Sequence, residues 1–228
     1  AAAAREAGAV LLARYGGRAA SLVRAAGGSA RALVRLLLAH FPSFRDEVPA
    51  PAWAGGAGRL VLWKRAQILV ADLWACFEGR GLGAFRDVDE ALTMFADYRL
   101  PQVLRHLGAL RLAPSLAAAL QAGERLEAGG RRELELRCCS VWAVHRIRLA
   151  MAAALRTKAQ ATAAAPADAQ DGDGQAGDGQ AGDAQAGDVQ AEAPLNCVAI
   201  DFFLWDYAKE HAAEMAHLPI HLTETIFY

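Results

Sequence analysis

The sequence lacks the paired cysteines of a metal-binding or redox motif. Its four cysteines show no C-x-x-C spacing and fall in apolar surroundings: Cys76, Cys138, Cys139 and Cys197. Free cysteine in such surroundings behaves as a small buried hydrophobe, and its use without a disulfide framework is typical of a reducing compartment. We therefore expect a cytoplasmic protein whose cysteines belong to the core.

An excess of charge of either sign is also missing. Lysine and arginine number 24 against 25 aspartates and glutamates, which gives a formal net charge of −1. This balance provides no basic field that would concentrate nucleic acid, and no basic run marks a helix lying on a membrane surface. We expect no direct nucleic-acid partner and no membrane partner.

Long hydrophobic runs are scarce. The apolar run 66–77, AQILVADLWACF, is too short to span a bilayer and contains Asp72. We identify no signal peptide, because the first apolar stretch, AAAAREAGAVLLARYGG, is amphipathic and interrupted by arginines. A chain of 228 residues is long enough for one domain with a substantial core. The sequence predicts a soluble, monomeric, single-domain protein.

The alternation of apolar and polar residues that marks strands is nearly absent, whereas helical periodicity recurs. The fold class predicted is therefore all-α. Helices are expected over 1–15, 29–40, 59–78, from Asp87 or Asp89, 101–110, from Pro114, 131–157 and 195–215. Residues 41–58, with three prolines and three glycines, are predicted to be a long connection.

Residues 159–193 contain little that could form a core. They are alanine, glycine, aspartate and glutamine, with an approximate five-residue repeat of the QAGDG type. Burial there cannot offset the entropy of ordering the chain, so we predict a disordered acidic insertion. The remaining parts, 1–158 and 194–228, are expected to form one helical domain.

Recognised metal, nucleotide and nucleophile motifs are missing too. His217 and His221 have the spacing of a helical ligand pair, but Pro219 between them breaks the helix that would align them. GRGLGAF has G-x-G spacing without the preceding strand of a nucleotide loop, and there is no G-x-S-x-G elbow. We expect no metal and no organic cofactor.

What the sequence does contain is a small number of acids and bases in apolar stretches. In TMFADYRLPQ, residues 93–102, Asp97 lies just before a helix expected to start at Pro101, with Leu100 as its N-cap. The helix dipole and free N–H groups at that end favour an anion. One interpretation is a catalytic carboxylate; the other is a connecting turn with an Asp97–Arg99 charge pair. The pattern does not decide between them.

Two further helical segments carry charges that need partners. At about 100° per residue, Arg65 and Asp72 lie within about 20° of each other on one helix, which indicates either a structural ion-pair network or a cationic face, Lys64 or Arg65, toward a phosphate. Asp201 and Asp206 are roughly 140° apart, so at most one faces a small pocket. Asp206 suits a surface pair with Lys209, whereas Asp201 beside Trp205 could cradle a cationic or ring-shaped ligand.

Five collinear segments resemble the queuosine salvage protein family. They are KRAQILVADLW (64–74), FRDVDEALTMFADYRLPQVLRHLGAL (85–110), ELELRCCSVWAV (133–144), AIDFFLWDYAKE (199–210) and PIHLTETIFY (219–228). The resemblance covers the chain apart from 159–193. It implies an all-helical fold similar to the helix-hairpin-helix DNA glycosylases and hydrolysis of queuosine 5′-monophosphate to queuine and ribose 5-phosphate.

The resemblance also implies roles for particular residues. Asp97 falls on the motif that holds the catalytic carboxylate, where it would stabilise or attack an oxocarbenium-like ribose. Matches to motif positions that would contact the substrate are Lys64, Arg65, Tyr98, Arg99, Asp201, Trp205 and Asp206. The cations would suit the phosphate, and Asp201 or Asp206 would suit a secondary ammonium on the queuine side chain.

Several features depart from the family pattern. Family chains are longer, and we expect the missing part to be N-terminal and to include an aromatic-rich segment at the ligand. RCCS (137–140), His145 and Glu224 stand where the family tends to have a glycine-containing run, a glutamate and a cation. The alternative function is therefore a catalytically inactive helical ligand-binding or scaffold protein.

Overall fold

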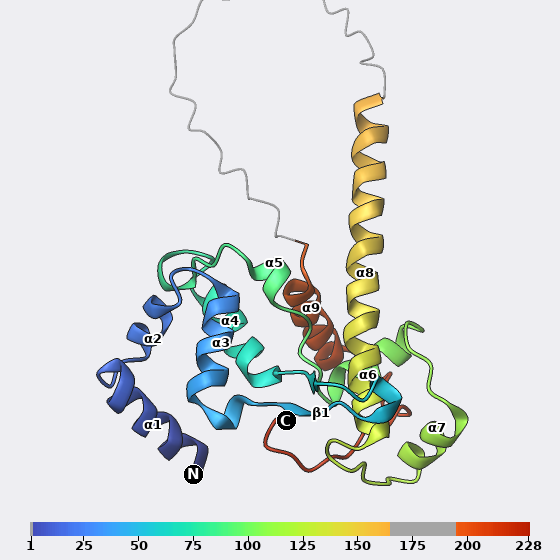
Figure 1. Cartoon of the computed structure of the whole chain (residues 1–228). Helices are drawn as coiled ribbons and strands as arrows, with labels where there is room; N and C mark the ends of the chain where they lie inside the picture. The colour runs from blue at the N-terminus through green and yellow to red at the C-terminus, as the bar shows by residue number, and fades with distance from the viewer. Residues whose placement is uncertain (1, 165–194) are drawn as a thin grey trace, which may run out of the picture.

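A computed structural model describes residues 2–164 and 195–228 of the chain (Figure 1). Its helices are α1 (Ala2–Tyr15), α2 (Ala19–Ala25), α3 (Ala30–His40), α4 (Lys64–Cys76), α5 (Val88–Ala91), α6 (Arg99–His106), α7 (Pro114–Gln121), α8 (Arg131–Ala164) and α9 (Cys197–Glu210). Three short 3₁₀ turns are η1 (Pro42–Phe44), η2 (Ala52–Ala54) and η3 (Gly81–Gly83). The predicted predominance of helix is confirmed. The prediction that the cysteines belong to the core is wrong for Cys76 and Cys139, which are exposed.

The segment predicted to be one helix over 59–78 is two elements. Strand β2 (Arg59–Val61) pairs antiparallel with β1 (Glu47–Pro49), with Glu47 opposite Val61. Trp63 then adopts a left-handed conformation with φ of 48°, which is costly for a bulky residue and turns the chain into α4. The connection 41–58 consequently contains a strand, and Lys64 becomes the first residue of a buried helix.

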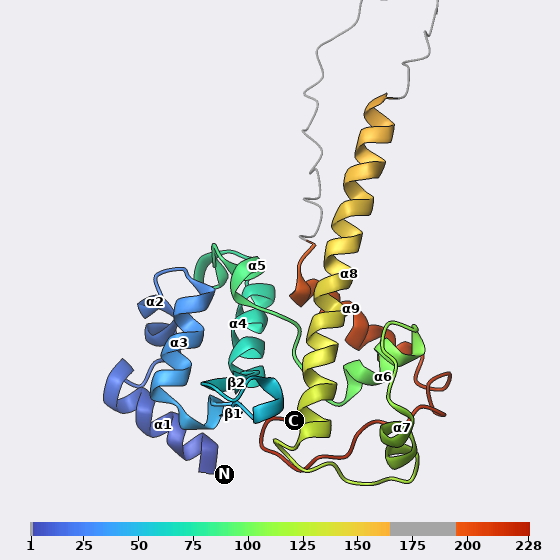
Figure 2. The same ribbon diagram turned by 45° about the vertical axis from the view of Figure 1, so that its right-hand side comes forward.

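Two hydrophobic clusters form the core, and they lie on the two sides of the molecule in Figures 1 and 2. One is built mainly on α2, α3 and α4, and the other on α6, α8 and α9. The segment joining α5 to α6 runs between them: Leu92 and Phe95 enter the first cluster, while Met94 and Ala96 enter the second. Because these side chains pack alternately into the two clusters, the backbone segment leading to Asp97 is held on both sides.

Asp87 stands at the start of α5, as predicted, but its side chain stabilises a different helix. It accepts hydrogen bonds from the N–H of Ala30 (2.6 Å) and Arg31 (3.3 Å), at the beginning of α3, and from the hydroxyl of Ser29 (2.8 Å). These bonds lower the pKa of the Asp87 carboxyl although its desolvation raises it. The cap therefore joins segments 57 residues apart in sequence.

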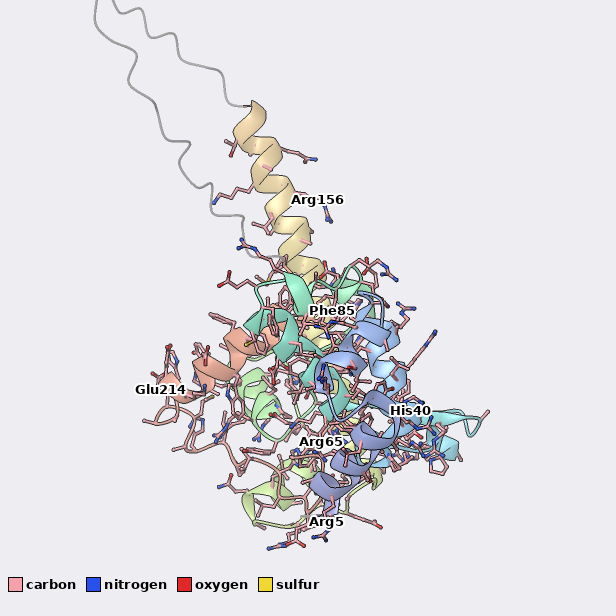
Figure 3. All side chains as sticks on the ribbon, turned by 90° about the vertical axis from the view of Figure 1, so that its left-hand side faces the viewer. Arg5, His40, Arg65, Phe85, Arg156 and Glu214 are labelled. Atoms are coloured by element: carbon pink, nitrogen blue, oxygen red, sulfur yellow. The ribbon has the colours of Figure 1, made fainter. Side chains whose placement is uncertain are left out.

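Helix α8 is longer than predicted and extends beyond the body of the molecule (Figures 1 and 2). It includes residues 159–164, so the start of the predicted disordered insertion is helical; alanine is the strongest helix former. The rest of that insertion lies outside the described residues. Arg156 marks the projecting half (Figure 3). Over Arg131–Thr162 the helix is long and apolar enough to cross a membrane, a property that core helices of soluble proteins share.

Candidate active site

Asp97 occupies the N-terminus of α6 and caps it. Its Oδ1 accepts hydrogen bonds from the backbone N–H of Arg99 (2.8 Å) and Leu100 (3.0 Å). The helix consequently begins at Arg99, two residues before the predicted start, and Pro101 falls in the first turn, where a missing N–H costs little. The predicted setting of an acid at a helix N-terminus is confirmed.

The Asp97 carboxylate is buried, with 8% of the residue exposed. Its Oδ2 has no hydrogen-bond partner among the described residues. Every fully buried side-chain oxygen in the described residues does have a partner, so Oδ2 is not fully buried and reaches the molecular surface. One oxygen of Asp97 is thus fixed by the helix, and the other is available to a ligand.

The predicted Asp97–Arg99 charge pair is not formed. The Arg99 guanidinium instead lies 3.3 Å from Oε1 of Gln102, through Nη1, and 5.8 Å from the centre of the Tyr98 ring. Arg99 contacts the Asp97 carboxylate through its backbone N–H and not through its guanidinium. The charge of Asp97 is therefore left for another partner.

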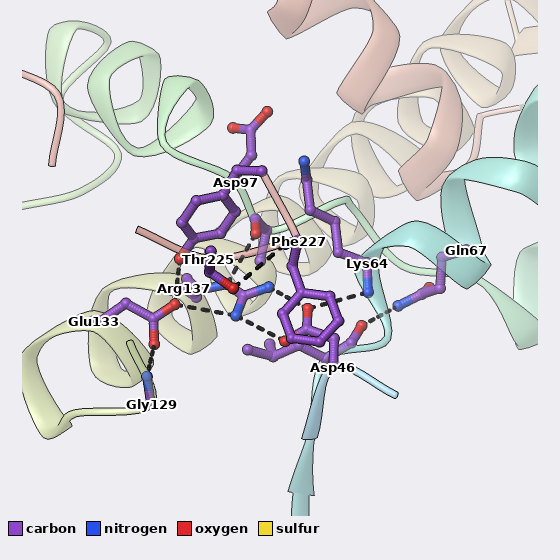
Figure 4. A network of polar contacts seen from close by, with 12 residues as sticks. Asp46, Lys64, Gln67, Asp97, Gly129, Glu133, Arg137, Thr225 and Phe227 are labelled. Carbon is purple, nitrogen blue, oxygen red and sulfur yellow. Dashed lines mark hydrogen bonds and ion pairs between the residues drawn. The ribbon is translucent and has the colours of Figure 1, made fainter. Parts of the chain in front are cut away.

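Lys64 places its ammonium on the same side of the site as the Asp97 carboxylate (Figure 4). The residue is 9% exposed, and its Nζ makes no hydrogen bond or ion pair with the described part of the chain. Burial lowers the pKa of Lys64, and the nearby carboxyls of Asp97 and Asp201 act in the opposite direction. The three side chains therefore share one electrostatic environment.

Asp201, from α9, lies near the Asp97 carboxylate and the Lys64 ammonium. It is 4% exposed, and its Oδ2 accepts a 2.7 Å hydrogen bond from the N–H of Phe95. Burial raises the pKa of the Asp201 carboxyl to about 8, with the negative charge of Asp97 adding to the rise and the Phe95 bond opposing it. Asp201 consequently holds a proton at pH 7, beside Asp97. Two carboxyls with different environments are a recurring arrangement for acid–base chemistry.

Two predicted contact residues on α9 lie outside this cluster. Asp206 is exposed and pairs with Lys209 at 2.9 Å, which confirms the predicted surface pair. The ring of Trp205 lies 5.6 Å from the same ammonium. Of the two aspartates on α9, Asp201 is the one brought to Asp97.

Arg65 has a structural partner. Its Nη1 donates to the carbonyl of Ser43 at 3.4 Å, and its guanidinium packs 5.2 Å from the centre of the Phe44 ring, which ties α4 to η1. Figure 3 labels its position on the α1 side of the body. Asp72 is exposed and forms no ion pair within the described residues, so the predicted network of Arg65 and Asp72 is wrong.

A buried ion-pair network that the sequence did not predict forms the base of the site (Figure 4). The Arg137 guanidinium, from α8, bonds both oxygens of Asp46, one of them at 3.1 Å. It also bonds Glu133 at 3.1 Å and the carbonyl of Ala96 at 2.9 Å. Burial alone would lower the Arg137 pKa, but the bonds and charge of Asp46 raise it. Arg137 therefore stays charged and holds the residue before Asp97.

The segment after α9 completes the wall around Asp97. His221 is 2% exposed, and its Nε2 lies 3.4 Å from the Asp97 carbonyl while its Nδ1 lies 3.0 Å from the Thr223 hydroxyl. Burial lowers the pKa of His221, so its ring is neutral at pH 7. Tyr98 and Tyr228 pack edge to face with ring centres 6.3 Å apart. Sequence reasoning missed His221 because its partner is 124 residues away.

The residues described by the structure contain no group of three or more histidines, cysteines, aspartates or glutamates arranged to hold a metal ion. The chemistry available in the described site is that of carboxyl, ammonium and phenol groups. The absence of a cofactor stays a prediction.

Comparison with known proteins identifies the relatives of this chain. The family model described as "Queuosine salvage protein" matches residues 1–228. Proteins named queuosine 5′-phosphate N-glycosylase/hydrolase are 37% identical in Mus musculus over 223 residues and 39% identical in Sphaerobacter thermophilus over 224 residues. Each match covers 98% of this chain and 55% of the relative. A Nematostella vectensis protein of the same name is 36% identical, over 98% of this chain and 56% of its own length. The chain thus spans about 55% of the length of these curated relatives.

Proposed function

This chain belongs to the queuosine salvage protein family, and we propose that the protein containing it hydrolyses the N-glycosidic bond of queuosine 5′-monophosphate. Water adds across the bond between the anomeric carbon and the base, giving queuine and ribose 5-phosphate. The observation that carries the proposal is the free Oδ2 of a buried, helix-capping Asp97 beside the unpaired ammonium of Lys64.

Asp97 is the group that acts on the sugar. Cleavage of an N-glycoside leaves its bonding electron pair on the base and positive charge on the ribose, which a carboxylate stabilises directly. Because Oδ1 is held by two backbone N–H groups, Oδ2 keeps a fixed position as that charge develops. The same oxygen is placed either to stabilise the cation while water attacks or to attack the sugar itself.

Asp201 is the acid of the site. The leaving base is a 7-deazaguanine, so protonation at ring position 7, the usual route for purines, does not exist, and the electron pair must be accepted elsewhere on the base. The pKa of about 8 keeps the Asp201 carboxyl protonated at neutral pH, as a general acid requires. Its Oδ1 makes no hydrogen bond within the described residues and so is free to donate.

Lys64 is the best-placed cation for the anionic part of the substrate. Of the three cations expected at the phosphate, Arg65 is engaged by Ser43 and Arg99 by Gln102. The Lys64 ammonium makes no such bond in the described part of the chain and retains its three donors.

We place the helical domain near the helix-hairpin-helix DNA glycosylases, acting as a monomer in the cytoplasm. Its substrate is a free nucleotide and not nucleic acid, because a net charge of −1 provides no basic footprint for a phosphate backbone.

The test uses the full-length protein that contains this chain. Incubation with queuosine 5′-monophosphate, followed by mass spectrometry of the products, should show queuine and ribose 5-phosphate released in equal amounts. Guanosine 5′-monophosphate serves as the matched control that lacks the deaza ring and its side chain. Binding of the queuosine nucleotide in calorimetry without product release would favour the alternative of an inactive ligand-binding protein.

A further inference from the structure

The Tyr228 ring lies close to both buried cations of the site, Lys64 and Arg137. The Lys64 ammonium lies 5.6 Å from the ring centre, and the Arg137 guanidinium carbon lies 5.0 Å from it. Both distances fall within the roughly 6 Å range in which a cation is attracted to an aromatic face. Tyr228 therefore links the cation expected to act on the substrate with the cation that organises the base of the site.

The Tyr228 ring is held in place by several contacts, one of them through its hydroxyl. The hydroxyl donates a hydrogen bond to Glu133, whose carboxylate is 2% exposed and also binds Arg137 at 3.1 Å and the N–H of Gly129 at 3.2 Å. Burial raises the pKa of the Tyr228 phenol, so it keeps its proton for this bond. The rings of His221 and Tyr98 pack against it edge to face, with centres 5.4 and 6.3 Å away.

The chain leading to Tyr228 is tied to the helix that Asp97 caps. The Arg105 guanidinium donates to the carbonyl of Pro219 at 2.9 Å, and the Gln102 amide donates to the carbonyl of Met215 at 3.2 Å. Farther along, the Leu222 carbonyl accepts from the N–H of Leu126 at 2.7 Å. The Tyr228 ring lies 5.6 Å from the Lys64 ammonium, and the segment that carries it is anchored to the same helix that Asp97 caps.

We propose that Tyr228 is a positioning residue of the site, which holds the Lys64 ammonium in place beside Asp97 and favours its charged form. The reason is that the Lys64 ammonium has no other direct partner in the described residues, and burial alone works against its charge. The cation–π interaction with the ring uses no hydrogen bond, so all three N–H donors of Lys64 remain available to the substrate. The expected effect on turnover rests on the proposed function; the effect on Lys64 does not.

The charge state of the Lys64 ammonium can be followed directly by NMR. The 228-residue sequence contains three lysines, Lys64, Lys158 and Lys209. In the full-length protein labelled with carbon-13 at the lysine Cε, the Lys64 signal can be assigned by its loss in Lys64→Arg and then titrated with pH. Tyr228→Leu removes the aromatic face, Tyr228→Phe keeps the face and removes the hydroxyl, and Phe203→Leu, at a residue that is 64% exposed, is the control for loss of an aromatic ring.

The expected result is a fall of about one unit in the Lys64 pKa in Tyr228→Leu, with Tyr228→Phe and Phe203→Leu near the parent value. Release of queuine by Tyr228→Leu should fall about ten-fold in kcat/KM, with the alkaline limb of its pH profile moved to lower pH. An unchanged Lys64 titration in Tyr228→Leu, or an equal change in Tyr228→Phe, would overturn the inference. If the parent protein releases no queuine, the proposed function fails, while the titration still tests Tyr228.

Discussion

The backbone N–H of Phe95 donates a 2.7 Å hydrogen bond to Oδ2 of Asp201, across 106 residues of sequence. This bond joins α9 to the segment that ends at Asp97. It gives a hydrogen-bond partner to one oxygen of the buried Asp201 carboxyl, and it holds that carboxyl near the carboxylate of Asp97. Because burial disfavours the charged form of the Asp201 carboxyl, the stability of the folded protein depends on whether this group is protonated.

The free energy of unfolding should decrease as pH rises through the window set by Asp201. The carboxyl has a pKa of about 8 in the folded protein against a usual value of 3.8, so the folded state holds a proton that the unfolded state has lost between these values. Stability then falls by about 1.4 kcal/mol per pH unit from this group. Asp201→Asn, which can still accept the Phe95 bond, should remove this contribution. Urea unfolding at pH 5 and pH 8 measures it.

The matched control for that experiment is Asp206→Asn on the same helix. Asp206 is exposed and pairs with Lys209, so its replacement should leave the pH dependence of unfolding as in the parent protein. Equal slopes for the parent protein and Asp201→Asn would contradict the assignment of a buried, protonated Asp201.

Replacing Arg137 should be the most damaging single change to the base of the site. Arg137→Leu leaves the carboxylates of Asp46 and Glu133 buried without a cation, and removing one partner of a buried ion pair costs about 3–5 kcal/mol. Arg132→Leu is the control, because its pair with Glu124 is about half exposed on both sides and should cost less than about 1 kcal/mol. Denaturant unfolding compares the two, and similar losses would show that the Arg137 network is not a buried one in solution.

Lys64→Met should reduce catalysis without disturbing the α4 helix. Methionine has similar length and helix propensity, so the change removes chiefly the charge that lies among Asp97, Asp201 and the Tyr228 ring. A lost charge-assisted contact to an anionic substrate corresponds to a reduction in kcat/KM of at least about ten-fold. Steady-state kinetics measure it, with Lys209→Met as the exposed control. A Lys64→Met protein with parental kcat/KM would remove Lys64 from the substrate contacts.

The sequence predicted the parts of the structure that depend on local pattern. The period of apolar residues located α3 within a residue of each end, and the acid before Pro101 was correctly associated with a helix N-terminus. The start of α6 was missed by two residues, since a capping side chain, and not the proline, defines where the helix begins. Over 159–164, composition suggested disorder whereas the alanine-rich chain continues the helix.

The parts that sequence could not predict depend on partners far away along the chain. Asp46 and Arg137 are 91 residues apart, and Asp87 caps a helix that begins 57 residues earlier. Nothing in the local pattern of either acid distinguishes it from a surface residue. Of the residues proposed to contact substrate, pattern alone could not separate Asp201 from Asp206, because the choice depends on which face of α9 meets Phe95.

The central claim is that the carboxylate of Asp97 carries the hydrolysis, and the most direct test is queuine release by full-length protein bearing Asp97→Asn. Asparagine can cap α6 as aspartate does, accepting from the N–H of Arg99 and Leu100, so the melting temperature should stay close to that of the parent protein. Without the negative charge, kcat for queuosine 5′-monophosphate should fall at least about 100-fold. A folded Asp97→Asn protein that releases queuine at the parental rate would contradict the claim.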